Sequence, residues 1–171
     1  MRRGEIEVIE ESLAIFLLAA AYDILLGEMP ARIHPVVWIG RLIAFLRVRV
    51  PASKAGGVLL ALAVIAATVL AGHMLVRAAG YIPLLPLLVS AFLLKSTFAM
   101  RCLIQVSSDI GRMIDADMGE ARSMLPALVG RDTASLNKSQ ASSAVIESLS
   151  ENYVDGILAP IFYYVLFAPL G

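Results

Sequence analysis

The sequence predicts an all-α, polytopic helical membrane protein with additional amphipathic and cytoplasmic helices. Hydrophobic residues make up 59% of the chain and the mean hydropathy is +0.81, well above the range of ordinary soluble domains. Residues 56–76 contain no Asp, Glu, Lys or Arg and would form a helix about 30 Å long, which matches the hydrocarbon core of a bilayer. Lipid cannot satisfy unpaired backbone groups, so such segments are expected to be helical.

Three further segments are predicted to enter the membrane. Residues 6–26 and 81–106 are long enough to span it, although Asp23 interrupts the first and both Lys95 and Arg101 interrupt the second. Residues 156–171 are uncharged but would reach only about 24 Å as a helix, so they predict a partial span. Four glutamates near the N-terminus argue against a cleaved signal peptide, and the first segment is expected to remain as an anchor.

Loop charges predict the orientation in the cell membrane. Residues 27–55 carry five basic side chains against one acidic side chain, which places this loop in the cytoplasm. Residues 36–50 are expected to form an amphipathic helix at the interface. Residues 107–155 then return to the cytoplasmic side. The net charge of zero gives no reason to expect nucleic acid, and a single cysteine excludes an intrachain disulfide.

The polar residues 107–155 are predicted to contain two helices. Residues 107–128 read as one helix with charged side chains on its solvated face. A second helix is expected to open at Ser139 or Ser142 and to close at Asp155-Gly156.

Three carboxylates are spaced four residues apart on this second helix: Glu147, Glu151 and Asp155. Helical spacing places them on one face, where like charges repel by a few tenths of a kcal/mol per pair. A cation or cationic substrate would compensate this repulsion. The row therefore predicts a metal site or a catalytic site at the membrane face, with Asn152 as a neutral donor and acceptor beside it.

The segment Val129-Gly-Arg-Asp-Thr-Ala-Ser-Leu136 precedes this helix. Gly130 would allow a flexible turn, Arg131 offers a fork for phosphate, and Asp132 and Thr133 offer ligands. Alternatively, Asp132 or Thr133 caps the following structure. Earlier in the chain, Asp23 reads either as a functional acid inside the membrane or as a hydrogen-bonding group of the bundle, and His34 reads either as a functional residue or as a turn residue before Pro35.

With these motifs, the chain resembles the adenosylcobinamide-phosphate synthase family, the membrane enzymes of cobalamin biosynthesis called CobD or CbiB. The resemblance lies in Val129-Gly-Arg-Asp-Thr133, in Glu147-Ser-Leu-Ser-Glu-Asn-Tyr-Val-Asp-Gly156 and in the following Ala159-Pro160. It extends to the early pattern Asp23-x3-Gly27-Glu-x-Pro30 and His34-Pro35-Val-x2-Ile39-Gly40-Arg41. The motifs occur in the family's order and cover the chain from about Asp23 onward.

The resemblance implies an ATP-dependent amide ligation of adenosylcobyric acid, a corrinoid, with aminopropanol phosphate, an amino-alcohol phosphate. ATP and Mg²⁺ are the implied cofactors. Catalytic and metal-binding roles are expected at Glu147, Glu151 and Asp155. Substrate-binding roles are expected at Arg131, Asp132, Thr133, Asn152, Asp23, His34 and Arg41.

Family members usually continue past the length of this chain, which therefore resembles an N-terminal half that a separate C-terminal half would complete. The 171 residues are expected to form a single membrane domain within the longer family domain. Two other function classes remain open. One is a helical transport component with an ion relay through Asp23, Lys95 and the carboxylate row. The other is a non-catalytic membrane subunit.

Overall fold

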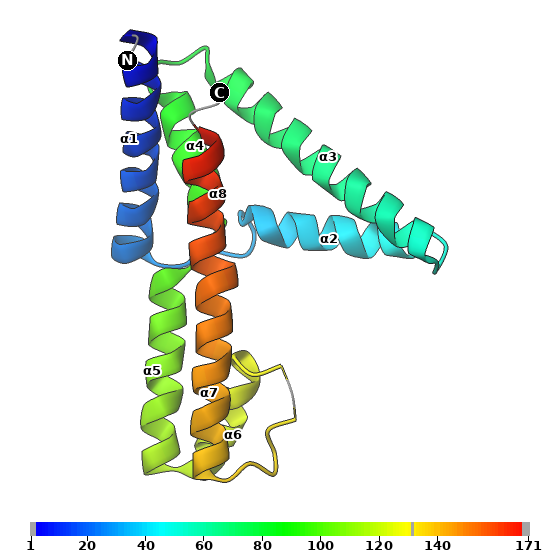
Figure 1. Cartoon of the computed structure of the whole chain (residues 1–171), viewed down its shortest axis with the longest axis vertical. Coiled ribbons are helices and arrows are strands. Elements are labelled where there is room, and N and C mark those ends of the chain that lie inside the picture. The colour runs from blue at the N-terminus through cyan, green and yellow to red at the C-terminus, as the bar shows by residue number, and fades with distance from the viewer. Residues whose placement is uncertain (1–2, 131, 169–171) are drawn as a thin grey trace. The chain divides into compact units, whose positions relative to one another are not determined.

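The computed structural model describes residues 3–130 and 132–168, and every regular element in these ranges is helical (Figure 1). The predicted all-α fold class is confirmed. The α-helices are α1 (Arg3–Leu26), α2 (Pro35–Arg47), α3 (Lys54–Ala79), α4 (Leu85–Lys95), α5 (Met100–Ala116), α6 (Met118–Met124), α7 (Lys138–Tyr153) and α8 (Ala159–Phe167). A 3₁₀ turn at Leu125–Ala127 follows α6, and a π-helical turn at Val154–Leu158 joins α7 to α8.

Contacts between residues divide the chain into two compact units. The first comprises Met1–Tyr22 and Met29–Thr97, and the second comprises Asp23–Glu28 and Phe98–Gly171. The last turn of α1 therefore belongs to the second unit. This helix ends at Leu26, as the predicted segment 6–26 does, and Gly27 follows it with a φ of +76°, the left-handed conformation that glycine adopts without strain.

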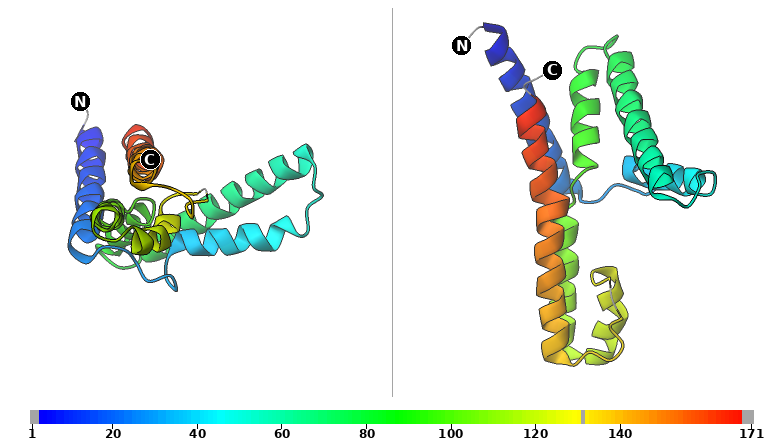
Figure 2. Two further views of the ribbon diagram at one scale, coloured as in Figure 1. Left: turned by 90° about the horizontal axis from the view of Figure 1, so that it is seen from below. Right: turned by 45° about the vertical axis from the view of Figure 1, so that its right-hand side comes forward.

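In the first unit, α3 packs against α2 and α4 (Figure 2). The predicted uncharged helix at 56–76 lies inside α3, which begins where the Ser53 Oγ accepts a hydrogen bond from the Gly56 N–H at 3.1 Å. The predicted amphipathic helix at 36–50 corresponds to α2. Its first turn is capped by His34, whose Nδ1 accepts from the Val36 N–H at 3.3 Å.

Among the residues that the structure describes, two helical stretches are long and apolar enough to cross a membrane: Lys54–Ala79 and Leu85–Ala116. Only 6% of the apolar window in the first stretch is buried, although its mean hydropathy is 2.4. The second stretch is interrupted between α4 and α5. Here the hydroxyls of Ser96 and Thr97 donate to the carbonyls of Leu93 and Leu94, at 2.7 and 2.6 Å. Side-chain donors thus occupy carbonyls near the end of α4, a competition that disfavours continued helix.

The second unit is built on α5 and α7, which lie side by side, with α6 packed against α5 (Figures 1 and 2). Their buried side chains recur at helical spacing and form one core. The members of this core are Ile110, Ile114, Ala121, Leu125, Val129, Ala141, Ala144 and Val145.

The prediction of a single helix over residues 107–128 is wrong. The chain leaves the helix at Asp117, which has extended backbone angles and begins α6. Its Oδ1 accepts hydrogen bonds from the N–H groups of Gly119 and Glu120, at 2.7 and 3.2 Å. Aspartate favours this capping position because its carboxylate satisfies backbone donors that the helix leaves unpaired.

Helix α7 spans Lys138–Tyr153, but the residues that the sequence predicted to open and close it are not the ones that do so. Neither Ser139 nor Ser142 opens it, because Asn137 and Gln140 form a capping box with reciprocal bonds of 2.9 and 3.0 Å. Nor does Asp155-Gly156 close it. The helix continues through the π-helical turn into α8, since the Ala159 N–H bonds to the Val154 carbonyl and Pro160 has no N–H to donate.

Candidate functional site

The first candidate site is a shallow hollow in the second unit, named here the carboxylate hollow. Its volume is about 170 Å³, and it is lined by Val129, Gly130, Glu147, Ser148 and Glu151. The core explains how these residues meet. Val129 is buried against α7 with Ala144 and Val145, so the backbone of Gly130 lies beside the next turns of that helix. Two motifs separated in sequence therefore share one hollow.

Glu147 and Glu151 are both exposed at this hollow and lie one helical turn apart. Each step of four residues rotates about 40° around a 3.6-residue helix, so Asp155 lies about 80° from Glu147 even before the π-helical turn changes its direction. The exposed Asp155 is not among the residues that line the hollow. The structure thus brings together two of the three predicted carboxylates.

In the described part of the chain, no group of three or more His, Cys, Asp or Glu side chains could hold a metal ion. A dedicated three-carboxylate site at Glu147, Glu151 and Asp155 is therefore not assembled. The remaining pair still fits Mg²⁺, which commonly binds one or two carboxylates and completes its shell with water and substrate phosphates. Metal binding by Glu147 and Glu151 stays a prediction.

The loop after Gly130 contains the other predicted ligands. Arg131 lies outside the described residues. Asp132 forms a local turn, since its Oδ1 accepts from the Ala134 N–H at 3.0 Å, and Thr133 is buried. The predicted alternative of a turn at Asp132 agrees with this geometry, but the helix that follows is capped by Asn137 rather than by Asp132 or Thr133. Arg122 holds the end of the loop, because its Nε and Nη2 donate to the Leu136 carbonyl at 3.3 and 3.0 Å.

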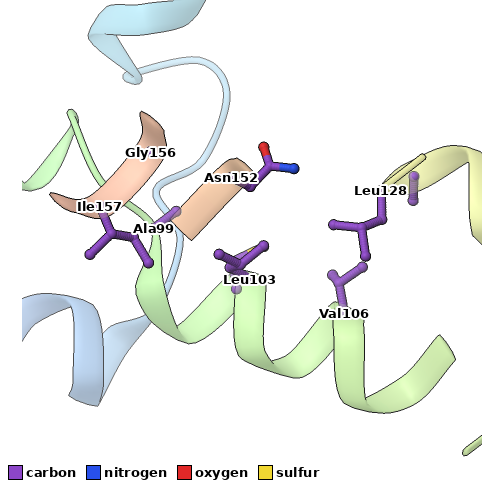
Figure 3. A pocket seen from close by; sticks show the side chains of 9 residues that line it. Ala99, Leu103, Val106, Leu128, Asn152, Gly156 and Ile157 are labelled. Atoms are coloured by element: carbon purple, nitrogen blue, oxygen red, sulfur yellow. The ribbon is translucent and has the colours of Figure 1, made fainter. Parts of the chain in front are cut away.

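A second hollow in the same unit, named here the Asn152 hollow, has a volume of about 250 Å³. Figure 3 shows the side chains of Leu103 and Val106 projecting from α5 toward the segments that carry Asn152 and Leu128. The Asn152 Nδ2 donates to the Ser148 carbonyl at 2.8 Å, one turn back on α7. The hollow is lined by Ala99, Cys102, Leu103, Val106, Ala127, Leu128, Asn152, Gly156 and Ile157.

Asp23 forms a hydrogen bond with Arg101 that the sequence did not predict. It is 1% exposed, and its Oδ2 accepts from the backbone N–H of Arg101 at 3.0 Å, in the first turn of α5. The Arg101 Nη1 donates in return to the carbonyls of Ile24 and Leu25, both at 2.9 Å, in the last turn of α1. The Asp23 carboxylate therefore accepts from a backbone N–H at the start of α5, and the Arg101 guanidinium donates to two backbone carbonyls at the end of α1.

Arg101 was not among the sequence-predicted site residues. A usable signal was present, because Asp23 lies in one long apolar segment and Arg101, like Lys95, lies in another, where charged side chains need partners. Ser148 was also not singled out, although it lies inside the Glu147–Glu151 motif. His34 and Arg41 belong to the first unit, where His34 caps α2 and Arg41 is exposed on that helix.

Over the described residues, the fold and the hollows define a class: an all-helical protein with two membrane-length apolar stretches and a helical unit that carries paired carboxylates. The sequence model of the family described as CobD/Cbib protein matches residues 16–171. The chain therefore belongs to the CobD/CbiB family.

Relatives agree with this assignment. The probable cobalamin biosynthesis protein CobD of Methanothrix thermoacetophila is 48% identical over 168 residues, covering 92% of this chain and 53% of that protein. The cobalamin biosynthesis protein CobD of Klebsiella pneumoniae is 38% identical over 164 residues, covering 91% and 51%. The chain spans about half the length of these curated relatives. No solved structure matches the chain.

Proposed function

We propose that this chain forms part of a membrane enzyme of cobalamin biosynthesis that joins adenosylcobyric acid to aminopropanol phosphate with consumption of ATP. The product is adenosylcobinamide phosphate. Relatives named for cobalamin biosynthesis support the pathway. The observation that carries the reaction type is the carboxylate hollow, in which Gly130 of the first motif meets Glu147 and Glu151 of the second.

Amide formation from a free carboxylic acid requires activation. The acid oxygen attacks the γ-phosphorus of ATP, and ADP leaves to give an acyl phosphate. The amine nitrogen then attacks the acyl carbon, phosphate leaves, and the nitrogen loses a proton. The reaction therefore requires groups that hold phosphates and one group that accepts the amine proton.

The residues of the hollow suit these tasks. One carboxylate of the Glu147–Glu151 pair accepts the amine proton, while the pair also holds Mg²⁺. When bound, Mg²⁺ supplies positive charge that offsets the charge of the phosphates. Gly130 has no atoms within 4 Å of the position of a Cβ, which leaves its backbone open to a substrate. Arg131, which follows it, would pair with a phosphate through its guanidinium fork.

The enzyme is proposed to be a multi-pass protein of the cell membrane with this site on the cytoplasmic side. Helix α3 supports the location because its apolar side chains stay exposed, as expected of a helix that faces lipid rather than a protein core. The basic residues of the segment 27–55 support the orientation.

A further segment is proposed to complete the enzyme, either in the same chain or as a separate second half, because relatives are about twice as long. We expect the 171-residue chain alone to show little or no ligation. Turnover by this chain alone, measured as ATP-dependent formation of the amide, would show that all essential groups lie within it.

The substitution Glu151→Gln in the full-length protein tests the role of the carboxylates. It removes one negative charge and keeps the shape of the side chain, so membrane insertion should be unchanged. We expect the rate of amide formation to fall on the order of 100-fold or more, the usual contribution of a positioned acid–base group.

Glu120→Gln is the matched control, because Glu120 is an exposed glutamate in the first turn of α6. Its effect on stability and activity should be small. Equal activity of the two variants would reduce the Glu147–Glu151 pair to a structural feature. An equal loss in both would indicate a folding defect instead.

A further inference from the structure

We infer that the Asn152 hollow binds the non-reacting flank of the carboxylic acid substrate, with apolar groups of that flank against the walls of the hollow and a polar group paired with Asn152. This inference rests on the proposed function, because it assigns a second region of the same site to one of the two organic substrates.

The two hollows follow the same pair of chain segments. Residues 127–128 line the Asn152 hollow and residues 129–130 line the carboxylate hollow. On α7, Ser148 lines the carboxylate hollow, and its carbonyl accepts the hydrogen bond from the Asn152 side chain of the other hollow. One extended ligand can therefore place its reacting carboxyl beside Glu151 and its remaining body beside Asn152.

The walls of the Asn152 hollow determine the class of ligand. Leu103, Val106 and Leu128 provide apolar surface, and Asn152 contributes an amide (Figure 3). One N–H of its Nδ2 is directed to Ser148, which leaves a second N–H and Oδ1 with hydrogen-bonding capacity. Small-molecule sites typically combine apolar walls with a few placed polar groups in this manner. A small polyanion such as ATP or the amine phosphate fits these walls poorly.

Gly156 keeps the hollow open. It lies in the π-helical turn and lines the hollow, and an added Cβ would meet no atom within 4 Å. A methyl group at this position would therefore occupy ligand space without a clash in the protein. Single π-helical turns within helices frequently occur at functional sites.

Cys102 provides a direct probe of occupancy, because it lines the hollow and is the only cysteine among the 171 residues. We expect adenosylcobyric acid to slow the reaction of its thiol with a small neutral maleimide about tenfold or more in the full-length protein. Aminopropanol phosphate or ATP should leave the rate unchanged. Peptide mapping locates the labelled thiol, and Cys102→Ser provides the background.

Gly156→Ala tests the space itself. We expect the KM of this variant for the acid to rise about tenfold, because one methyl group in an apolar pocket typically changes discrimination by about this factor. The KM values for ATP and the amine should be unchanged. Gly111→Ala is the matched control. Gly111 lies on α5 outside the hollow, and an added Cβ there also meets nothing within 4 Å. This variant should behave like the wild type in both assays.

The outcomes separate this inference from the proposed function. If the wild-type protein ligates its substrates but the acid does not protect Cys102, and Gly156→Ala matches Gly111→Ala, the inference is overturned and the proposed function stands. If the wild-type protein neither binds the acid nor ligates it, both fail. Protection by ATP or the amine phosphate alone would assign the hollow to another substrate and would also overturn the inference.

Discussion

The bond between Asp23 and Arg101 gives the sharpest test of a structural role against a functional one. Asp23 is almost fully buried and caps the first turn of α5 from a position 78 residues earlier in the chain. Asp23→Ala removes this acceptor and leaves the Arg101 N–H without its carboxylate partner. A hydrogen bond to a charged group contributes about 1.5–3 kcal/mol, and an orphaned buried donor costs about 1–3 kcal/mol.

These two quantities describe the same lost interaction, so they are not added. The expected loss of stability for Asp23→Ala is about 2–3 kcal/mol. For a chain of this size, that loss corresponds to a decrease of about 4–12 °C in the melting temperature. Asp23→Asn should lose less, because its side-chain oxygen can still accept the Arg101 N–H.

The assay is thermal unfolding in detergent, followed by circular dichroism at the helical band, with ligation activity measured at a temperature where every variant is folded. Asp117→Ala is a comparison, since it removes an exposed helix cap with a typical cost of about 1 kcal/mol. If Asp23→Asn abolishes activity at unchanged stability, Asp23 acts on a substrate and the structural explanation is refuted.

Two other predictions concern the second unit that carries the hollows. Ile110→Ala should destabilise it by about 2–4 kcal/mol, because Ile110 is fully buried in the core, whereas Ile104→Ala on the exposed side of α5 should have little effect in the same melting experiment. Asn137→Ala should cost about 1 kcal/mol by removing one half of the capping box, and Ser139→Ala should be nearly silent because Ser139 does not cap the helix. A larger loss in Ser139→Ala than in Asn137→Ala would contradict the observed start of α7.

The local pattern of the sequence was sufficient for much of the fold. The uncharged run at 56–76, the glycine after Leu26 and the alternation of polar and apolar residues at 36–50 predicted α3, the end of α1 and α2. These features depend on neighbours within a few residues, which is the range over which periodicity and capping act. The motifs around Gly130 and Glu147 likewise indicated the family before any contact was known.

Other predicted helix boundaries were wrong. The reasons are still local, but they depend on which of several neighbouring residues caps or continues the helix. Asp117 interrupts a predicted helix, and its carboxylate accepts from two N–H groups that the start of α6 would otherwise leave unpaired. Asn137 replaces the two serines as the start of α7 because Gln140 returns its hydrogen bond. The π-helical turn before Pro160 carries the chain past Asp155-Gly156, where the sequence predicted an end.

The sequence by itself determined which segments are helical and apolar and which motifs carry charge. Only the tertiary structure decided which polar groups meet. Packing of Val129 against α7 placed Gly130 beside Glu147 and Glu151 and left Asp155 outside this hollow. The same kind of long-range contact paired Asp23 with Arg101. Such contacts depend on how cores and helix ends fit together in three dimensions, and sequence spacing does not encode that fit directly.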